Sequence, residues 1–179
     1  IGAMFINEQT EEFGTDHFYA ADTFNEMTPR TNDTKYLANV SKAIHGAMTA
    51  GDPMAVWVMQ GWLFLESFWQ PAQVKALLTA VPLGKMLLLD LDSCDLEQYT
   101  RTHSYYGQPF IFNMLHNFGG QLMLFGRSSV INTRVIAARD MANSSMGGTG
   151  FTPEGIHTSY IIYDFMAEMA WREKPMLDL

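Results

Sequence analysis

The chain has 179 residues, of which 47% are apolar and 17% charged, a composition typical of a folded protein with a core. The formal net charge is −8, from 11 Lys and Arg against 19 Asp and Glu, which argues against a nucleic-acid-binding protein because such proteins neutralise phosphates with basic patches. No apolar run approaches the ~18 residues that a membrane-spanning helix needs, so neither nucleic acid nor a membrane is an expected partner.

The first half of the chain alternates apolar segments with amphipathic ones. The apolar segment 17–24 predicts a strand, and the spacing of apolar residues over 34–51 predicts a helix. A second strand is expected at 55–59. A second helix is expected over 71–82, because Pro71 suits the first helical turn.

The second half continues the same alternation. Strands are predicted at 86–91, at 110–115 and near 146–151. Residues 92–107 lack a clear period and are expected to form a long loop with room for a short helix. Further helices are expected within 119–142 and over 159–171.

Short apolar strands that alternate with amphipathic helices indicate an α/β fold with a parallel sheet. An open nucleotide-binding sheet would place a glycine-rich phosphate loop after its first strand, and the sequence has neither GxGxxG nor GxxxxGK[ST] at such a position. A (β/α)8 barrel instead carries polar functional residues after its strands. The sequence therefore predicts part of a (β/α)8 TIM-type barrel.

Polar and aromatic residues follow all five predicted strands, where parallel strands share one edge. They are Asn25-Glu26, Gln60-Gly61-Trp62, Asp90-Leu91-Asp92, His116-Asn117-Phe118 and Glu154. Carboxylates, amides and aromatic rings suit a sugar, and Glu26 and Glu154 could supply the two carboxyl groups of glycoside hydrolysis. Alternatively, either glutamate serves only as a polar residue of a loop.

The sequence offers little for a metal or a cofactor. The single cysteine, Cys94, excludes an internal disulfide and a cysteine-rich zinc site. Asp90 and Asp92 with His116 match no defined metal motif, so a structural role is expected for them. We expect no metal and no cofactor.

Five sequence blocks closely resemble the α-N-acetylglucosaminidase family, glycoside hydrolase family 89, in the same order and over nearly the whole chain. They are YAADTFNEMT at 19–28, AVWVMQGWLF at 55–64, GQPFI at 107–111, MLHNFGG at 114–120 and GTGFTPEGI at 148–156. The resemblance implies a retaining exo-glycosidase that removes terminal α-linked N-acetylglucosamine, from heparan sulfate in the animal enzyme and from mucin-type glycans in bacterial relatives.

The resemblance also assigns roles to residues. It implies that Glu26 is the general acid/base and Glu154 the nucleophile. The residues that it places around the sugar are Asn25, Trp62, Leu91 and Phe118. It further implies a lysosomal or secreted protein. Asn143, in a predicted loop, is the expected N-glycosylation acceptor in a eukaryotic host.

The chemistry of the substrate supports a protein nucleophile. In an α-linked N-acetylglucosamine the 2-acetamido group is cis to the leaving oxygen, so it cannot attack the anomeric carbon from the opposite side. Retention then requires a carboxylate nucleophile. The two carboxyl groups of a retaining enzyme lie roughly 5 to 5.5 Å apart, against about 6.5 to 9.5 Å in an inverting one.

A whole barrel takes ~250 residues, so residues 1–179 are expected to form its second half, with 157–179 leading towards a downstream helical domain. The family places its carboxylates on strands four and seven, whereas five candidate strands would place them on four and eight. One candidate is therefore expected to lie outside the barrel. The alternative function is an inactive carbohydrate-binding barrel fragment that keeps Trp62 and Phe118. The oligomeric state stays open.

Overall fold

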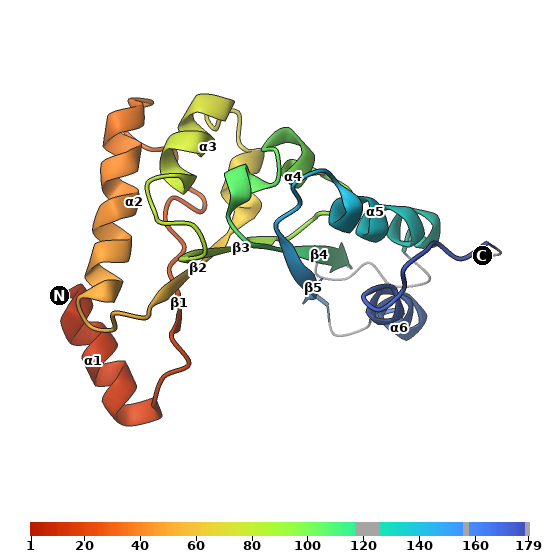
Figure 1. Cartoon of the computed structure of the whole chain (residues 1–179), viewed down its shortest axis with the longest axis horizontal. Helices are drawn as coiled ribbons and strands as arrows, with labels where there is room; N and C mark the ends of the chain where they lie inside the picture. The colour runs from red at the N-terminus through yellow and green to blue at the C-terminus, as the bar shows by residue number, and fades with distance from the viewer. Residues whose placement is uncertain (117–125, 156–157, 178–179) are drawn as a thin grey trace.

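The computed structural model describes residues 1–116, 126–155 and 158–177, and its centre is a sheet of five parallel strands (Figure 1). The strands are β1 (Phe18–Ala20), β2 (Val56–Gln60), β3 (Met86–Asp90), β4 (Phe110–His116) and β5 (Met146–Pro153). They pair in chain order, β1 to β5, so each strand neighbours the next one along the sequence. The predicted parallel α/β arrangement is confirmed.

All five predicted strands pair in one continuous sheet, which contradicts the expectation that one of them lies outside the barrel. The first strand is much shorter than the predicted 17–24, with three residues, Phe18–Ala20. It is nevertheless paired in register with β2, from Phe18 opposite Val56 to Ala20 opposite Val58. The chain leaves the sheet after Ala20 because a turn follows, in which Phe24 has a positive φ of 61°.

Helices precede, connect and follow the strands. They are α1 (Gly2–Phe13), α2 (Thr34–Thr49), α3 (Pro71–Leu78), α4 (Gln98–Arg101), α5 (Ser128–Asp140) and α6 (Tyr160–Met169), with short 3-10 helices η1 (Gly61–Leu65) and η2 (Tyr105–Gly107). The four predicted helices are confirmed, and α4 is the short helix for which the 92–107 loop had room. The helices α1, η1 and η2 were not predicted. None of the helices in the described residues is long and apolar enough to cross a membrane.

The local signals for α2 and α3 work as expected. The Asp33 side chain accepts a hydrogen bond from the Lys35 N–H at 3.0 Å and so caps the start of α2. Pro71 begins α3, where its missing N–H costs no helical hydrogen bond. The two helices pack side by side, and the Ser41 hydroxyl of α2 donates to the Leu77 carbonyl of α3 at 2.7 Å.

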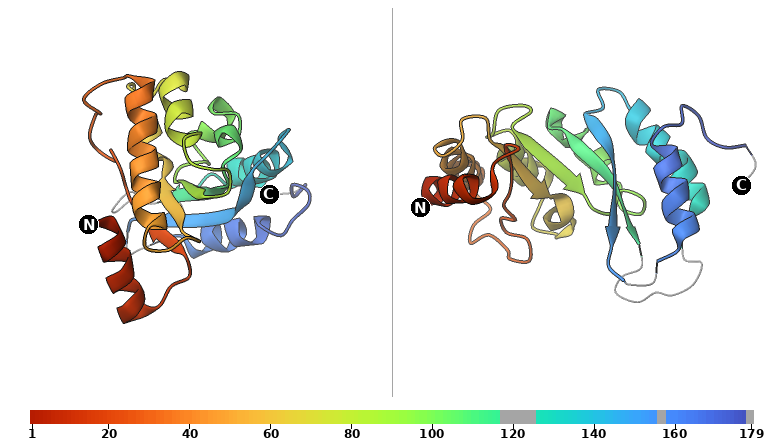
Figure 2. Two further views of the ribbon diagram at one scale, coloured as in Figure 1. Left: turned by 60° about the vertical axis from the view of Figure 1, so that its left-hand side comes forward. Right: turned by 90° about the horizontal axis from the view of Figure 1, so that it is seen from below.

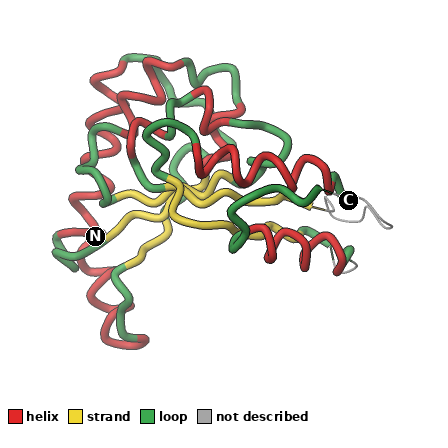
Figure 3. Tube along the Cα trace, turned by 45° about the vertical axis from the view of Figure 1, so that its right-hand side comes forward, coloured by secondary structure: helices red, strands yellow, loops and turns green. Residues whose placement is uncertain are grey.

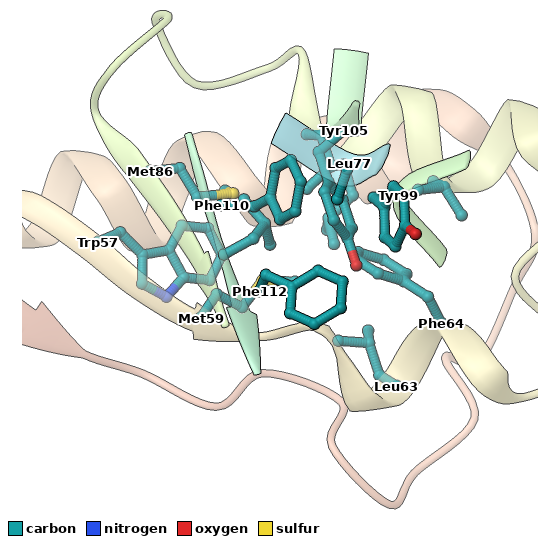
Figure 4. Close-up of a cluster of buried hydrophobic side chains, with 14 of the residues drawn as sticks. Trp57, Met59, Leu63, Phe64, Leu77, Met86, Tyr99, Tyr105, Phe110 and Phe112 are labelled. Atoms are coloured by element: carbon teal, nitrogen blue, oxygen red, sulfur yellow. The ribbon is translucent and has the colours of Figure 1, made fainter. Parts of the chain in front are cut away.

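Most helices lie on one side of the strand layer (Figure 3), and α5 lies beside α6 (Figure 2). Side chains of β2 and β3 alternate accordingly: Trp57, Met59, Met86 and Leu88 are fully buried, whereas their sequence neighbours are half-buried. The buried set packs with Phe110 and Phe112 of β4 and with Leu77 of α3 (Figure 4). The core therefore lies between the sheet and its helices, on the outer side of the predicted barrel.

A hydrogen-bond network around Asp52 ties β1 to β2 at their amino ends. One oxygen of Asp52 accepts from the Tyr19 hydroxyl at 2.8 Å and lies 2.7 Å from Nδ1 of His17, and the other accepts from the Met54 N–H at 2.9 Å. The bond to His17 is the largest cause that lowers the pKa of Asp52 to about 2. These hydrogen bonds join β1 to the segment before β2, in addition to the few backbone hydrogen bonds that the three-residue β1 can form.

Replacing Asp52 by Asn is expected to lower the free energy of unfolding of the full-length protein by about 2 kcal/mol near neutral pH, because charge-assisted hydrogen bonds are lost. A carboxyl with a lowered folded-state pKa contributes stability above its ordinary value of 3.8, and this contribution disappears as the pH falls towards 2. Urea unfolding at pH 6 and pH 3 measures both effects. Asp140→Asn, at an exposed residue, is the control. An Asp52→Asn variant as stable as this control at pH 6 would contradict the prediction.

Candidate active site

The carboxyl ends of the strands surround a pocket of about 190 Å³. Its lining residues are Asn25, Glu26, Gln60, Trp62, Leu91, Leu115 and Glu154. Five of the six predicted site residues are thus brought together at one place, although they come from the segments after four different strands. The sixth, Phe118, lies outside the described residues.

The Asn25-Glu26 side of the pocket is formed by the turn after β1. Phe24 adopts the left-handed region, which a bulky residue rarely does. Its ring packs against the buried Trp69, with ring centroids 6.1 Å apart, and this contact holds the turn against the core. Oδ1 of Asn25 is buried and accepts no hydrogen bond from the described residues, which leaves it available to a ligand in the pocket.

A second carboxyl, that of Asp22, lies close to Glu26 in the same turn. Burial, and then the negative charge of Glu26, raise the pKa of Asp22 above its ordinary value. Asp22 therefore holds its proton to a higher pH than an isolated carboxyl does. Two acidic groups, of which only Glu26 lines the pocket, therefore lie close together in this turn.

Glu154 follows the end of β5 directly. The register of β5 on β4 brings Thr152 opposite Leu115 and Pro153 opposite His116, so Glu154 leaves the sheet beside the end of β4. The side chain of Asn113 fills the space above Gly150, where any Cβ would collide with its amide oxygen. The lack of a side chain at Gly150 thus leaves room for the Asn113 side chain below the pocket.

The wall between these two sides comes from β2 and η1. Gly61 begins η1, and a Cβ at this position would lie 3.2 Å from both the Leu89 carbonyl oxygen and the Tyr105 hydroxyl. The glycine therefore lets the turn lie directly on the end of β3. As a result the residues on either side of it, Gln60 and Trp62, both face the pocket.

Gln60 and Leu115 also line the pocket, and neither was among the residues that the resemblance placed around the sugar. Gln60 ends β2 within a block that resembles the family, and this position was a usable signal. Leu115 stands two residues after Asn113 on β4, so the two share a face of the sheet. The sequence could have identified Leu115 as a pocket residue only if the exact register of β4 in the sheet had been known.

The structure keeps Asp90 and Asp92 buried beside the pocket wall. Burial is the main cause that raises the pKa of Asp90 to about 7 and that of Asp92 to about 6. Within the described ranges, no three His, Cys, Asp or Glu side chains are grouped so that they could hold a metal ion.

Comparisons with known proteins agree on one family. Residues 1–173 match the model described as the alpha-N-acetylglucosaminidase (NAGLU) tim-barrel domain. The whole chain is 52% identical over 181 residues to human alpha-N-acetylglucosaminidase, of which it covers 24%.

Solved structures agree as well. The family 89 glycoside hydrolase of Clostridium perfringens in complex with 2-acetamido-1,2-dideoxynojirmycin matches 96% of the chain with a TM-score of 0.78 and 28% identity. A form of that enzyme with two Glu-to-Gln substitutions, in complex with its substrate GlcNAc-alpha-1,4-galactose, matches 96% of the chain with a TM-score of 0.78 and 26% identity. The chain covers 18% of these bacterial chains and about a quarter of the human protein. The predicted barrel is confirmed by these matches, as part of a TIM-type barrel.

Proposed function

Because the chain belongs to the α-N-acetylglucosaminidase family, we propose that it carries the catalytic residues of a glycosidase that removes terminal α-linked N-acetylglucosamine from glycans. The observation that carries this proposal is the placement of Glu26 and Glu154 on one pocket. The substrate complex of the bacterial relative, with its two Glu-to-Gln substitutions, adds support, since two glutamates are the groups that a glycosidase would lose when inactivated.

The proposed mechanism is a double displacement with retention. Glu154 attacks the anomeric carbon while Glu26 protonates the leaving oxygen, and a covalent glycosyl-enzyme forms. Glu26 then takes a proton from water, which attacks the anomeric carbon and releases Glu154. The cis orientation of the 2-acetamido group, which prevents it from acting as the nucleophile, supports this mechanism.

The remaining pocket residues would hold the sugar. The half-buried Trp62 offers an aromatic face to the apolar side of a pyranose. The unpartnered Oδ1 of Asn25 can accept a hydrogen bond from a sugar hydroxyl or from the acetamido N–H. Leu91 adds an apolar wall. By the family resemblance, Phe118 would be a further sugar contact.

We further propose a natural glycan, a domain organisation and a compartment for the whole protein. Heparan sulfate is the proposed natural glycan and a lysosomal or secreted location the proposed compartment, with the 52% identity to the human protein as support. Asn143, exposed in the turn after α5, is the proposed glycosylation site. In the whole protein, residues 1–179 would supply the second half of the barrel and 157–179 would lead towards a helical domain, as the small share of the relatives' length suggests.

Proton NMR of an aryl α-N-acetylglucosaminide incubated with the full-length protein tests the proposal. We expect the α-anomer of N-acetylglucosamine to appear first, before mutarotation, because two inversions restore the configuration. The aryl β-N-acetylglucosaminide and the aryl α-glucoside are the controls, and neither should be cleaved at a comparable rate. First release of the β-anomer would disprove retention. Sugar binding without hydrolysis would favour the carbohydrate-binding alternative.

A further inference from the structure

Trp57 is a buried tryptophan of β2 that the mechanism above does not use. Its side chain is fully buried in the core and lies beside that of Met86, its partner across the pairing of β2 with β3 (Figure 4). Its backbone N–H donates to the Lys85 carbonyl at 3.0 Å. Trp57 does not line the sugar pocket, so any effect that it has on the reaction is transmitted by other residues.

The indole N–H of Trp57 reaches the neighbouring strand. In the register of the sheet Trp57 lies opposite Tyr19 of β1. The indole extends from there towards the carboxyl end of β1, where Nε1 donates to the backbone carbonyl of Ala21 at 2.7 Å. A buried indole N–H usually has a hydrogen-bond partner, and here that partner is the first residue after β1.

Ala21 is held by β2 through both of its backbone polar groups. Its N–H donates to the Val58 carbonyl at 3.2 Å, and its carbonyl accepts the bond from Trp57. Because peptide units are planar, these two bonds orient the planes on either side of the Ala21 Cα and so restrict φ and ψ of this residue. Two successive residues of β2 therefore set the direction in which the chain leaves the sheet.

The turn that begins at Ala21 carries Glu26 into the pocket. Its middle is attached to the core through the Phe24 ring, which packs against Trp69. Its end is closed by a hydrogen bond from the Met27 N–H to the Phe24 carbonyl at 3.3 Å. Two attachments to the core thus precede Glu26 in the sequence, one at the Ala21 carbonyl and one at the Phe24 ring.

Glu26 needs a well-defined position for its proposed role. A general acid acts only within hydrogen-bond reach of the leaving oxygen, and a displacement of about 1 Å can lower a rate by about 10²-fold. The tilted contact between Phe24 and Trp69, with the ring planes at 49°, leaves room for small displacements, whereas a hydrogen bond weakens steeply as its angle departs from linear. The bond from Trp57 therefore restricts the start of the turn more than the ring contact does.

We propose that Trp57 is a positioning residue for the general acid/base: its indole N–H holds the Ala21 carbonyl and so fixes the direction in which the following turn presents Glu26 to the leaving oxygen. Without this donor the peptide after Ala21 can rotate, and Glu26 moves with it. Glu154 follows β5, at the opposite edge of the sheet, and keeps its place. This inference rests on the proposed function, since it concerns the task of Glu26 in that reaction.

The first test is Trp57→Phe in the full-length protein, which keeps an aromatic ring in the core and removes the N–H. We expect kcat/KM to fall about 20-fold for a disaccharide with terminal α-linked N-acetylglucosamine, because its leaving oxygen needs a proton from Glu26. For a dinitrophenyl α-N-acetylglucosaminide, which needs no such proton, kcat/KM should change less than about threefold. Steady-state kinetics with both substrates measures the two losses.

Ser41→Ala is the matched control. It removes another side-chain hydrogen bond to a buried backbone carbonyl, the bond from Ser41 to Leu77, which is also 2.7 Å long but joins α2 to α3. This variant should lose stability without changing the ratio of the two kcat/KM values. A Trp57→Phe variant that loses kcat/KM equally for both substrates, or for neither, would overturn the inference, because Trp57 would then contribute to packing alone.

A second variant keeps the shape of the core and decides the matter where Trp57→Phe does not fold. Replacement of Trp57 by 3-benzothienylalanine, incorporated at a suppressed stop codon, exchanges the N–H for a sulfur that cannot donate a hydrogen bond. The loss should again be confined to the disaccharide. Unchanged kinetics with both substrates would overturn the inference. An unsubstituted protein that hydrolyses neither substrate would refute the proposed function, and this inference with it.

Discussion

Replacing Glu154 by Gln in the full-length protein is expected to lower kcat for aryl α-N-acetylglucosaminides by about 10⁴-fold or more. An amide cannot form the glycosyl-enzyme ester, and the 2-acetamido group is on the wrong face to replace it. Removal of a covalent nucleophile costs factors of this size in other hydrolases. Initial rates measured with an aryl leaving group, together with the bound sugar detected by saturation-transfer NMR, separate loss of chemistry from loss of binding.

The control for this variant is Glu66→Gln. Glu66 is an exposed glutamate directly after η1, near the pocket in sequence but not part of its lining. Its kcat should stay within about twofold of the unsubstituted protein. If Glu154→Gln kept a tenth or more of the activity, Glu154 would not be the nucleophile.

The effect of Glu26→Gln is expected to depend on the leaving group. A general acid contributes about 10²- to 10⁴-fold where the leaving oxygen needs a proton. We therefore expect kcat/KM to fall about 10³-fold for a disaccharide and much less for a dinitrophenyl glycoside, whose leaving group departs without protonation. Steady-state kinetics with both substrates measures this difference.

Asp22→Asn is the companion variant, because Asp22 is the neighbouring carboxyl that Glu26 influences and it does not line the pocket. Any loss that it causes should be small and equal for the two leaving groups. A loss in Glu26→Gln that is likewise equal for both would show that Glu26 binds or orients the sugar and is not the acid.

The regular elements were predictable because their signals are local. Apolar strands and the helix-start signals at Asp33 and Pro71 act over a few residues, and the structure follows them. The helix α1 escaped prediction because its apolar residues form no continuous stripe, and only Ile6 among them is buried. The first strand was predicted too long, since the sequence does not reveal that Phe24 turns away from the sheet.

The pocket was predictable for a different reason. Parallel strands end at one edge, so residues after successive strands meet regardless of their distance in the sequence, as Glu26 and Glu154 do. The buried residues behind the pocket wall were not predictable. A left-handed run through Ser104 and Tyr105 contradicts local propensity, and the burial of Asp90 depends on long-range packing.

The network around Asp52 and the pocket occupy opposite ends of the same strands. His17 and Asp52 precede β1 and β2, whereas the pocket residues lie at the carboxyl ends of the strands or just after them. Substitutions around the pocket should therefore change which glycan binds without affecting the hydrogen bonds around Asp52, which join the strands at their other end. Natural variants should differ in the same way. Those near Asp52 should lower the amount of folded protein, and those at the pocket should lower the turnover of each molecule.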